Sequence, residues 1–260
     1  MTVNYNSDGT RMPDSFFKPE PVVISGGFMS SPGDYLSWQK LLASRSIRRR
    51  SVVTKIGRSD WYMTRNSDFS RQLAALDSAV KKARQISGSE KVWLVCHSAG
   101  GTVARLWMGD TPYNGQCYEG YSFVKGIIFL GSPYISAEPN ALKAVEFLNE
   151  RNPGAYFPEI KYVSVAGKSI FGKANGSFLQ RMAFKSYSKV TPAHPQQWGD
   201  GVITLEAAYM PGATNITLTG INHISLLGQP GYSASQAMEI WGRYFNEVEG
   251  DSGNHRTAVA

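Results

Sequence analysis

The sequence predicts a protein of the α/β class, in which a mostly parallel central sheet carries helices on both faces. Segments typical of buried strands alternate with segments of helical periodicity, and most connections between them are short. A second observation is that the strand at 92–96 runs directly into a helical pattern at about Ala99, as in the βα units of such sheets. A chain of 260 residues can bury a sufficient core without disulfides or a metal ion.

The individual elements follow from their residue patterns. Segments rich in β-branched and apolar residues and bounded by turn residues are expected to be strands. They are residues 22–25, 52–56, 92–96, 124–130, 160–165 and 215–219. Segments with apolar residues at helical spacing are expected to be helices. They are residues 34–44, 68–86, 99–109, 140–149 and 233–248.

The turn after the strand at 92–96 has the sequence Cys96-His97-Ser98-Ala99-Gly100. A serine in a sharp strand-to-helix turn holds its hydroxyl clear of the backbone, and the helix N-terminus supplies an N–H and a positive dipole end where an oxyanion would form. The usual pattern is Gly-x-Ser-x-Gly, and Cys96 is small enough to replace the first glycine. The competing interpretation is a serine that only caps the helix.

A nucleophilic serine requires a base and an acid later in the chain, each just after a strand. Of the four histidines, His223 is the one that follows a predicted strand. His97 lies inside the turn, where its side chain is expected to point back into the scaffold. His194 lies in a proline-rich loop, and His255 lies in a polar tail. His223 is therefore the predicted base.

Asp200 is the predicted acid because it lies between two glycines, after the strand at 160–165 and before the strand that leads to His223. Glycines permit the tight backbone that turns a carboxylate inward. An aspartate in an isolated Gly-Asp-Gly would be interpreted as an ordinary turn residue. The prediction for Asp200 therefore depends on the position of this segment between the two predicted strands. Glu206 is the reserve candidate, but it falls in a short helical pattern.

The first strand ends in paired glycines, Gly26 and Gly27, which let the backbone approach a substrate carbonyl closely. The N–H of Phe28 is the candidate second oxyanion donor beside the N–H of Ala99. Gly27, Met29 and His97 are expected to contact the substrate. A phosphate-binding loop would continue into a Lys-Ser/Thr pair, which is absent, so nucleotide binding is not expected.

These segments agree in type, order and context, and the sequence resembles the α/β-hydrolase superfamily, specifically its serine lipases and esterases, from about residue 21 to residue 245. Ser25-Gly26-Gly27-Phe28 resembles the His-Gly-x oxyanion segment, with glycine where histidine is usual. Leu130-Gly131-Ser132-Pro133-Tyr134 resembles Leu-Gly-Thr-Pro-His. Asp200-Gly201-Val202-Ile203-Thr204-Leu205 resembles the Asp-Gly-x-Val-Pro-Leu stretch around the lipase acid.

Two further stretches, Val95-Cys96-His97-Ser98-Ala99-Gly100-Gly101 and Tyr162-Val163-Ser164-Val165-Ala166-Gly167-Lys168, are similar to lipase-like hydrolases of cyanobacteria and plastid-bearing plants. Those belong to the same broad group as the GPI-inositol deacylases. The resemblance implies a lipase-like acyl hydrolase that cleaves lipid or other apolar esters through Ser98, Asp200 and His223 by way of an acyl-enzyme. No metal or organic cofactor is expected.

Three rival functions remain open at this point. The same triad could transfer the acyl group to an alcohol or lipid instead of water. It could also serve a peptidase or a thioesterase. Finally, the fold could be retained as a non-catalytic binding module, which predicts a missing or displaced triad member, and none is missing here.

The alternation of strands and helices is interrupted once, at 167–198, by an insertion rich in aromatic residues. One interpretation is a small cap, or a wall for the acyl chain, over the catalytic face. The other is that the aromatic residues only pack the insertion onto the domain. The expected organisation is a loosely ordered arm at 1–20, a single α/β-hydrolase domain at 21–249 and a flexible tail at 250–260.

The formal net charge of +7 suggests an anionic partner. A basic run accounts for part of it, at positions Arg45, Arg48, Arg49 and Arg50. We interpret this run as a solvated rim that complements the C-terminal dipole of the helix at 34–44, with a weak attraction to an anionic membrane surface. No nucleic-acid-binding motif accompanies it. The expected partner is thus an ester or lipid substrate, and the oligomeric state is not predicted.

The sequence contains no run of about 18 apolar residues and begins without the basic and apolar regions of a secretory signal. Its two cysteines, Cys96 and Cys117, are expected to be free thiols in a reducing compartment, and a cytoplasmic protein is the prediction.

Overall fold

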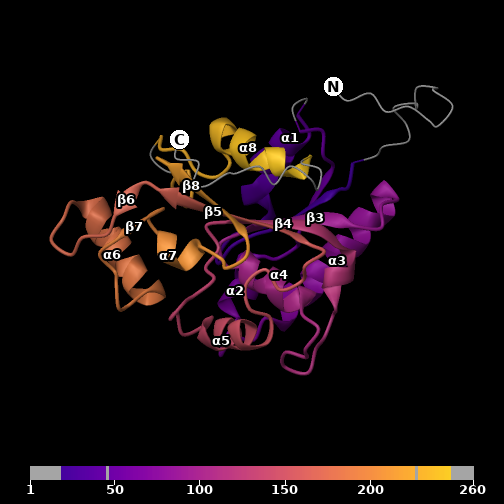
Figure 1. Ribbon diagram of the computed structural model, residues 1–260, viewed down its shortest axis with the longest axis horizontal. Coiled ribbons are helices and arrows are strands. Elements are labelled where there is room, and N and C mark those ends of the chain that lie inside the picture. Colours follow the sequence, from indigo (N-terminus) through magenta and orange to yellow (C-terminus); the bar gives the residue numbers. More distant parts are fainter. Residues whose placement is uncertain (1–18, 45–46, 226–227, 247–260) are drawn as a thin grey trace.

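A central sheet of six parallel strands runs through the molecule in the order β2-β1-β3-β4-β5-β8 (Figure 1). It is seen in a computed structural model that describes residues 19–44, 47–225 and 228–246. The strands are β1 (Val22–Ser25), β2 (Ser51–Val53), β3 (Val92–His97), β4 (Val124–Leu130), β5 (Lys161–Lys168) and β8 (Thr214–Thr219). The predicted α/β class with a mostly parallel sheet is confirmed.

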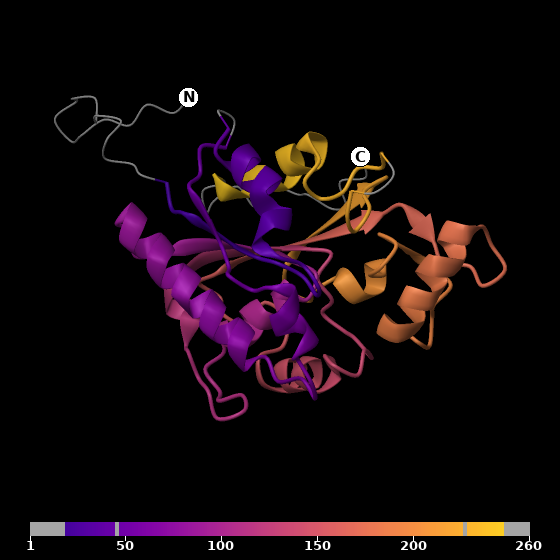
Figure 2. The same ribbon diagram turned by 180° about the vertical axis from the view of Figure 1, so that it is seen from behind.

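Helices cover both faces of this sheet (Figures 1 and 2). On one face lie α1 (Leu36–Leu42) and α8 (Ser235–Gly242), and on the other lie α3 (Ser70–Ser87), α4 (Gly100–Met108) and α5 (Leu142–Arg151). The strands β1 to β5 therefore contribute apolar side chains to two cores, whereas β8 contributes only to the core under α1 and α8. In β3, Leu94 joins the core under α3 and α4, whereas Trp93 and Val95 join the core under α1 and α8. This two-sided burial explains the continuous apolar run of β3.

Several short elements were not predicted. They are α2 (Arg58–Tyr62), the antiparallel pair β6 (Ile170–Phe171) and β7 (Trp198–Gly199), and α6 (Phe178–Val190). Single-turn 3-10 helices also occur at Pro32–Tyr35, Gly120–Phe123 and Arg243–Phe245. The short helical pattern around Glu206 corresponds to α7 (Leu205–Ala208).

The insertion at 167–198 forms one folded unit at the end of the molecule, built from β6, α6 and β7 (Figure 2). Ser177 caps α6, and the Gln180 side chain accepts from the Ser177 N–H in return, which is a capping box. The buried Tyr187 hydroxyl accepts from the Gly201 N–H at 2.9 Å and donates to the Ile170 carbonyl at 3.0 Å. One side chain of α6 thus ties the insertion to the segment that contains Asp200.

The interpretation of the basic run as a solvated rim is wrong for Arg49. Its side chain is buried, forms an ion pair with Glu20 at 2.8 Å, and donates to the Phe245 carbonyl at 2.9 Å and to Asn246 at 3.0 Å. A planar guanidinium can join several acceptors at once, which a solvated cation does not do. Arg49 is therefore a structural link between the first strand and the last described helical turn.

Parts of the predicted organisation lie outside the described residues. These are the arm up to residue 18, the tail at 250–260, the end of the helix predicted at 233–248, and Arg45. Both cysteines are free, Cys96 buried and Cys117 exposed. None of the described helices is both long and apolar enough to span a lipid bilayer.

Candidate active site

Ser98 occupies the sharp turn between β3 and α4 and adopts a left-handed backbone with φ of 54°. A non-glycine residue in this region is strained by about 1–3 kcal/mol and persists only where its surroundings hold it. The Ser98 N–H donates to the Leu130 carbonyl of the neighbouring strand at 3.0 Å, and the Ser98 carbonyl accepts from the Gly101 N–H at 3.0 Å. The sheet and the helix therefore hold both sides of the strained residue.

Neighbouring backbone segments approach this turn too closely for larger side chains. A Cβ atom on Gly100 would lie 2.3 Å from the Ser25 carbonyl oxygen, and one on Gly27 would lie 2.7 Å from the Ser98 Cβ. Cys96, in the place of the usual first glycine, is fully buried in the core under α3 and α4. Its carbonyl accepts from the Ser132 hydroxyl at 3.0 Å. The turn thus accommodates Cys96, whereas the positions of Gly27 and Gly100 leave no room for a side chain.

Asp200 and His223 form a buried pair at the carboxyl end of the sheet. The Nδ1 atom of His223 lies 2.7 Å from the Oδ2 atom of Asp200. The other carboxylate oxygen, Oδ1, accepts from the N–H groups of Val202 at 2.9 Å and Ile203 at 2.7 Å. The His223 N–H donates to the Asp200 carbonyl at 2.8 Å, so the two residues are joined through backbone as well as side chains.

The charge state of Asp200 follows from this environment. Burial raises its pKa, but the charge of His223 and the hydrogen bonds from His223, Ile203 and Val202 outweigh burial, and the net pKa is lowered. An ionised carboxylate accepts the Nδ1–H of His223, which leaves Nε2 of His223 free of that proton and able to act as a base.

Tyr232 is a further member of this cluster that the sequence analysis missed. Its buried hydroxyl donates to Oδ2 of Asp200 at 2.9 Å and accepts from the Gly167 N–H at 2.8 Å. Burial and the Asp200 charge raise the pKa of Tyr232 well above its usual value, so the hydroxyl keeps its proton. With this bond all four acceptor positions of the buried carboxylate have a donor.

A second chain of hydrogen bonds passes through His97. Its Nε2 lies 2.9 Å from the His223 carbonyl oxygen, and its Nδ1 lies 2.9 Å from the Tyr35 hydroxyl, which also accepts from the Gly27 N–H at 2.8 Å. A carbonyl oxygen can only accept, so Nε2 of His97 carries the proton and the Tyr35 hydroxyl donates to Nδ1. Burial, with the repulsion of His223, lowers the pKa of His97 to about 3, and the ring is neutral.

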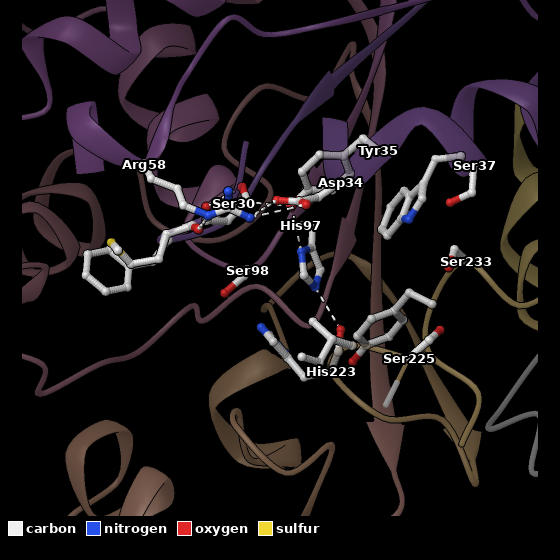
Figure 3. Close-up of a pocket in the computed structure, with 16 residues that line it drawn as sticks. Ser30, Asp34, Tyr35, Ser37, Arg58, His97, Ser98, His223, Ser225 and Ser233 are labelled. Carbon is white, nitrogen blue, oxygen red and sulfur yellow. Dashed lines mark hydrogen bonds and ion pairs between the residues drawn. The ribbon is translucent and has the colours of Figure 1, made fainter. Parts of the chain in front are cut away.

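Two cavities meet at Ser98. The larger, of about 510 Å³, is lined by polar side chains that include Arg58, Asp34, Ser30 and His223 (Figure 3). The smaller, of about 280 Å³, is mainly apolar. Its apolar lining consists of Phe28, Trp61, Phe69, Ala99, Pro133, Ala141, Val190, Val202 and Ile203. Ser98 and Phe28 are common to both cavities.

Figure 3 shows the Ser98 hydroxyl and a ring nitrogen of His223 close to one another among the residues that line the larger cavity. No hydrogen bond joins these two side chains, both of which the structure describes. Nucleophile and base are often farther apart before a substrate binds. The Oγ of Ser98 therefore faces His223 without a hydrogen bond to it.

The other predicted site residues are distributed as follows. Gly27 and Met29 line the larger cavity with Phe28, whose side chain is 57% exposed. His97 also borders that cavity, but both of its ring nitrogens are occupied by protein partners, which leaves no polar atom for a substrate. The reserve acid Glu206 lies apart from Asp200 and accepts from Gln197 at 2.9 Å.

Across residues 19–44, 47–225 and 228–246, no three His, Cys, Asp or Glu side chains are grouped in a way that could bind a metal ion.

Solved structures with the same fold include lipases. The mature lipase BlEst2 of Bacillus licheniformis is 19% identical, with a TM-score of 0.56 over 79% of this chain and 85% of that chain. The product of gene lin2722 of Listeria innocua is 12% identical, with a TM-score of 0.54 over 90% and 96%. Phospholipase PlaB of Legionella pneumophila is 14% identical, with a TM-score of 0.59 over 89% of this chain and 61% of that chain. The chain has the α/β-hydrolase fold.

Comparisons at the level of sequence give no relative. No protein-family model matches the chain, and no curated protein matches it. The identities to the solved structures are low enough that they establish the fold alone.

Removing the side chain of Ser98 tests the strain at the turn. We expect Ser98→Gly to be more stable than Ser98→Ala by about 1 kcal/mol, because only glycine adopts a positive φ without cost. Ser78, exposed in the middle of α3, is the control, since there glycine should be less stable than alanine. Urea unfolding of the four variants measures both differences. Equal stability of the two Ser98 variants would show that the turn is unstrained.

The neutral His97 predicts a pH dependence of stability. Its pKa is about 3 in the folded protein against 6.5 as its ordinary value, so the unfolded chain binds the additional proton between these values. Stability is therefore lost as the pH falls, by about 2 kcal/mol between pH 7 and pH 5. Urea unfolding at both pH values should show a smaller loss for His97→Gln and an unchanged loss for the exposed His194→Gln. A His97→Gln variant with the wild-type pH dependence would contradict the neutral, buried state.

Proposed function

We propose that this protein is a serine carboxylic-ester hydrolase of the lipase type, acting on lipid or other apolar esters. The observation that carries the proposal is the buried pair of Asp200 and His223 facing a serine in a left-handed strand-to-helix turn. This combination supports nucleophilic catalysis, because the carboxylate orients the imidazole and stabilises its cation while the turn exposes the serine hydroxyl. The narrower resemblance to the group that includes the GPI-inositol deacylases stays a prediction.

In the proposed mechanism Nε2 of His223 takes the Ser98 proton as Oγ attacks the ester carbonyl. The negative charge moves to the carbonyl oxygen, where the N–H groups of Ala99 and Phe28 stabilise it. The tetrahedral intermediate then collapses, the ester bond breaks, and His223 gives the proton to the departing alcohol. Water attacks the acyl-enzyme by the same route, releasing the carboxylic acid and restoring Ser98.

The two cavities indicate how an ester substrate would be oriented at Ser98. The leaving alcohol must receive its proton from His223, which lines the larger and more polar of the two cavities and not the smaller one. The acyl group then extends to the other side of Ser98, into the apolar cavity that Ala99 borders. An ester with an apolar acyl group and a more polar alcohol fits this arrangement. BlEst2 and PlaB are by their names a lipase and a phospholipase, which agrees with such a substrate.

Labelling with a fluorophosphonate probe tests the proposal. We expect the purified wild-type protein to be labelled and Ser98→Ala to be unlabelled, because only an activated serine reacts with the probe. Ester hydrolysis should fall by at least about 10³-fold in the same variant. Circular dichroism provides the control for folding. Unchanged hydrolysis by a folded Ser98→Ala protein would refute the assignment, and a product esterified to an added alcohol would indicate acyl transfer instead.

The hydrogen bonds that the Tyr35 hydroxyl makes with Gly27 and His97 predict that Tyr35 contributes to activity. Tyr35→Phe removes the acceptor of the Gly27 N–H and the donor to His97, so the oxyanion loop and the base lose a common support. We expect kcat to fall by about 10-fold with little change in KM, because the lost contacts orient the transition state and do not bind substrate. Tyr113→Phe is the matched control, since this buried hydroxyl donates to the Ser67 carbonyl and lines neither cavity. A similar fall in both variants would exclude a specific role for Tyr35.

A further inference from the structure

The insertion at 167–198 has an unusual charge. It contains five Lys or Arg residues, at positions 168, 173, 181, 185 and 189, and no Asp or Glu. It therefore supplies a formal charge of +5 in a chain whose net charge is +7. A concentration of one sign of charge on a single folded unit attracts partners of the opposite sign.

The outer face of α6 combines these cations with large apolar side chains. Phe178, Met182, Lys185 and Lys189 follow one another at spacings of four, three and four residues, and so share one face of the helix. Phe178 and Met182 are 66% and 52% exposed. The opposite face is buried through Ala183, Tyr187 and Val190. The helix thus packs one face against the domain, and its solvent-exposed face carries both cationic and apolar side chains.

The insertion exposes two further apolar side chains. Leu179 is 45% exposed at the start of α6, and Trp198 is 43% exposed on β7. Lys168 lies over the Trp198 ring, with its Nζ 5.5 Å from the centroid. Exposed apolar side chains beside Lys and Arg are the combination found on helices that lie in the interface of anionic bilayers. We define Phe178, Leu179, Met182 and Trp198, with the five cations, as the cap surface.

The cap surface is connected to the candidate active site. Ser186, Lys189 and Val190 of α6 line the apolar cavity that reaches Ser98. Tyr187 bonds α6 to Gly201, the residue after Asp200. A lipid held at the cap surface would therefore lie beside the entrance to the proposed acyl cavity. In both views α6 is at the end of the molecule opposite α3 (Figures 1 and 2).

We infer that the cap surface docks this protein on an anionic lipid bilayer. Phe178, Leu179 and Met182 enter the headgroup region, and Lys173, Arg181 and Lys185 lie against anionic headgroups. Lys189 contributes less, because it already pairs with Glu138 at 4.0 Å. A second copy of the chain does not fit, because two such surfaces would bring like charges together. Nucleic acid does not fit the exposed leucine and methionine. The docking goes beyond the proposed hydrolysis and requires no turnover.

Vesicle sedimentation with the Ser98→Ala protein tests the docking without consuming lipid. We expect stronger binding to phosphatidylcholine vesicles containing about 30 mol % phosphatidylglycerol than to pure phosphatidylcholine, and release at high salt. The double change Arg181→Glu and Lys185→Glu should weaken the anionic binding by at least about 10-fold, because each cation near the surface contributes. Neither residue lines either of the two cavities that meet at Ser98.

Lys40→Glu with Lys82→Glu is the matched control, because these exposed lysines lie on α1 and α3 and give the same change in net charge. We expect it to retain wild-type vesicle binding. Phe178→Ala with Met182→Ala should weaken binding with no change in charge.

Four results would overturn the inference. They are equal binding to both vesicle types, equal loss in the cap and control charge variants, stronger binding to duplex DNA than to anionic vesicles, and a concentration-dependent dimer that Phe178→Ala with Met182→Ala abolishes. The readout is independent of ester hydrolysis, so a failure here leaves the proposed function standing, and a failure of hydrolysis leaves the docking standing.

Discussion

The left-handed turn at Ser98 is the constraint on which the candidate site depends. A non-glycine residue holds this conformation only if both sides of the turn are fixed, and here β4 and α4 fix it through hydrogen bonds to the Ser98 backbone. Ser25 lies in register with Cys96, and Leu130 lies in register with His97. The strands β1 and β4 therefore end beside Ser98, and the loops that follow them begin there. The strand order β1-β3-β4 thus determines which segments can contribute to an oxyanion site.

The buried carboxylate imposes the second constraint. An ionised Asp200 is stable without solvent only because every oxygen has donors, and these come from different parts of the chain. Val202 and Ile203 belong to its own loop, whereas His223 and Tyr232 lie 23 and 32 residues further along. The Asp200 carboxylate therefore has all of its hydrogen-bond donors only when the ends of β5 and β8 are adjacent. The charged state of the acid thus depends on the completed sheet.

The sequence predicted those parts of the fold and of the candidate site that local patterns mark. Ser98, Asp200 and His223 each come after a strand, and Ser98 and Asp200 also have small neighbours, so they could be nominated without a structure. Tyr35 and Tyr232 could not, because an aromatic residue in an apolar segment looks like core, and its polar role arises from elements distant in sequence. Arg49 was misinterpreted for the same reason, since one of its acceptors, the Phe245 carbonyl, is 196 residues away. The start of α6 did carry a local signal, Ser177 with Gln180, that a search for capping boxes would find.

The two histidines at the site show how environment divides the roles of one residue type. Their ring centroids are 4.7 Å apart, yet only His223 has a carboxylate against its Nδ1. A cation on His223, as the proposed mechanism requires, is stabilised by Asp200 and would be opposed by a second cation on His97. Burial removes that opposition by keeping His97 neutral. The neutral ring can then donate to the His223 carbonyl and accept from Tyr35, so it supports the base and the Gly27 loop together without changing the charge of the site.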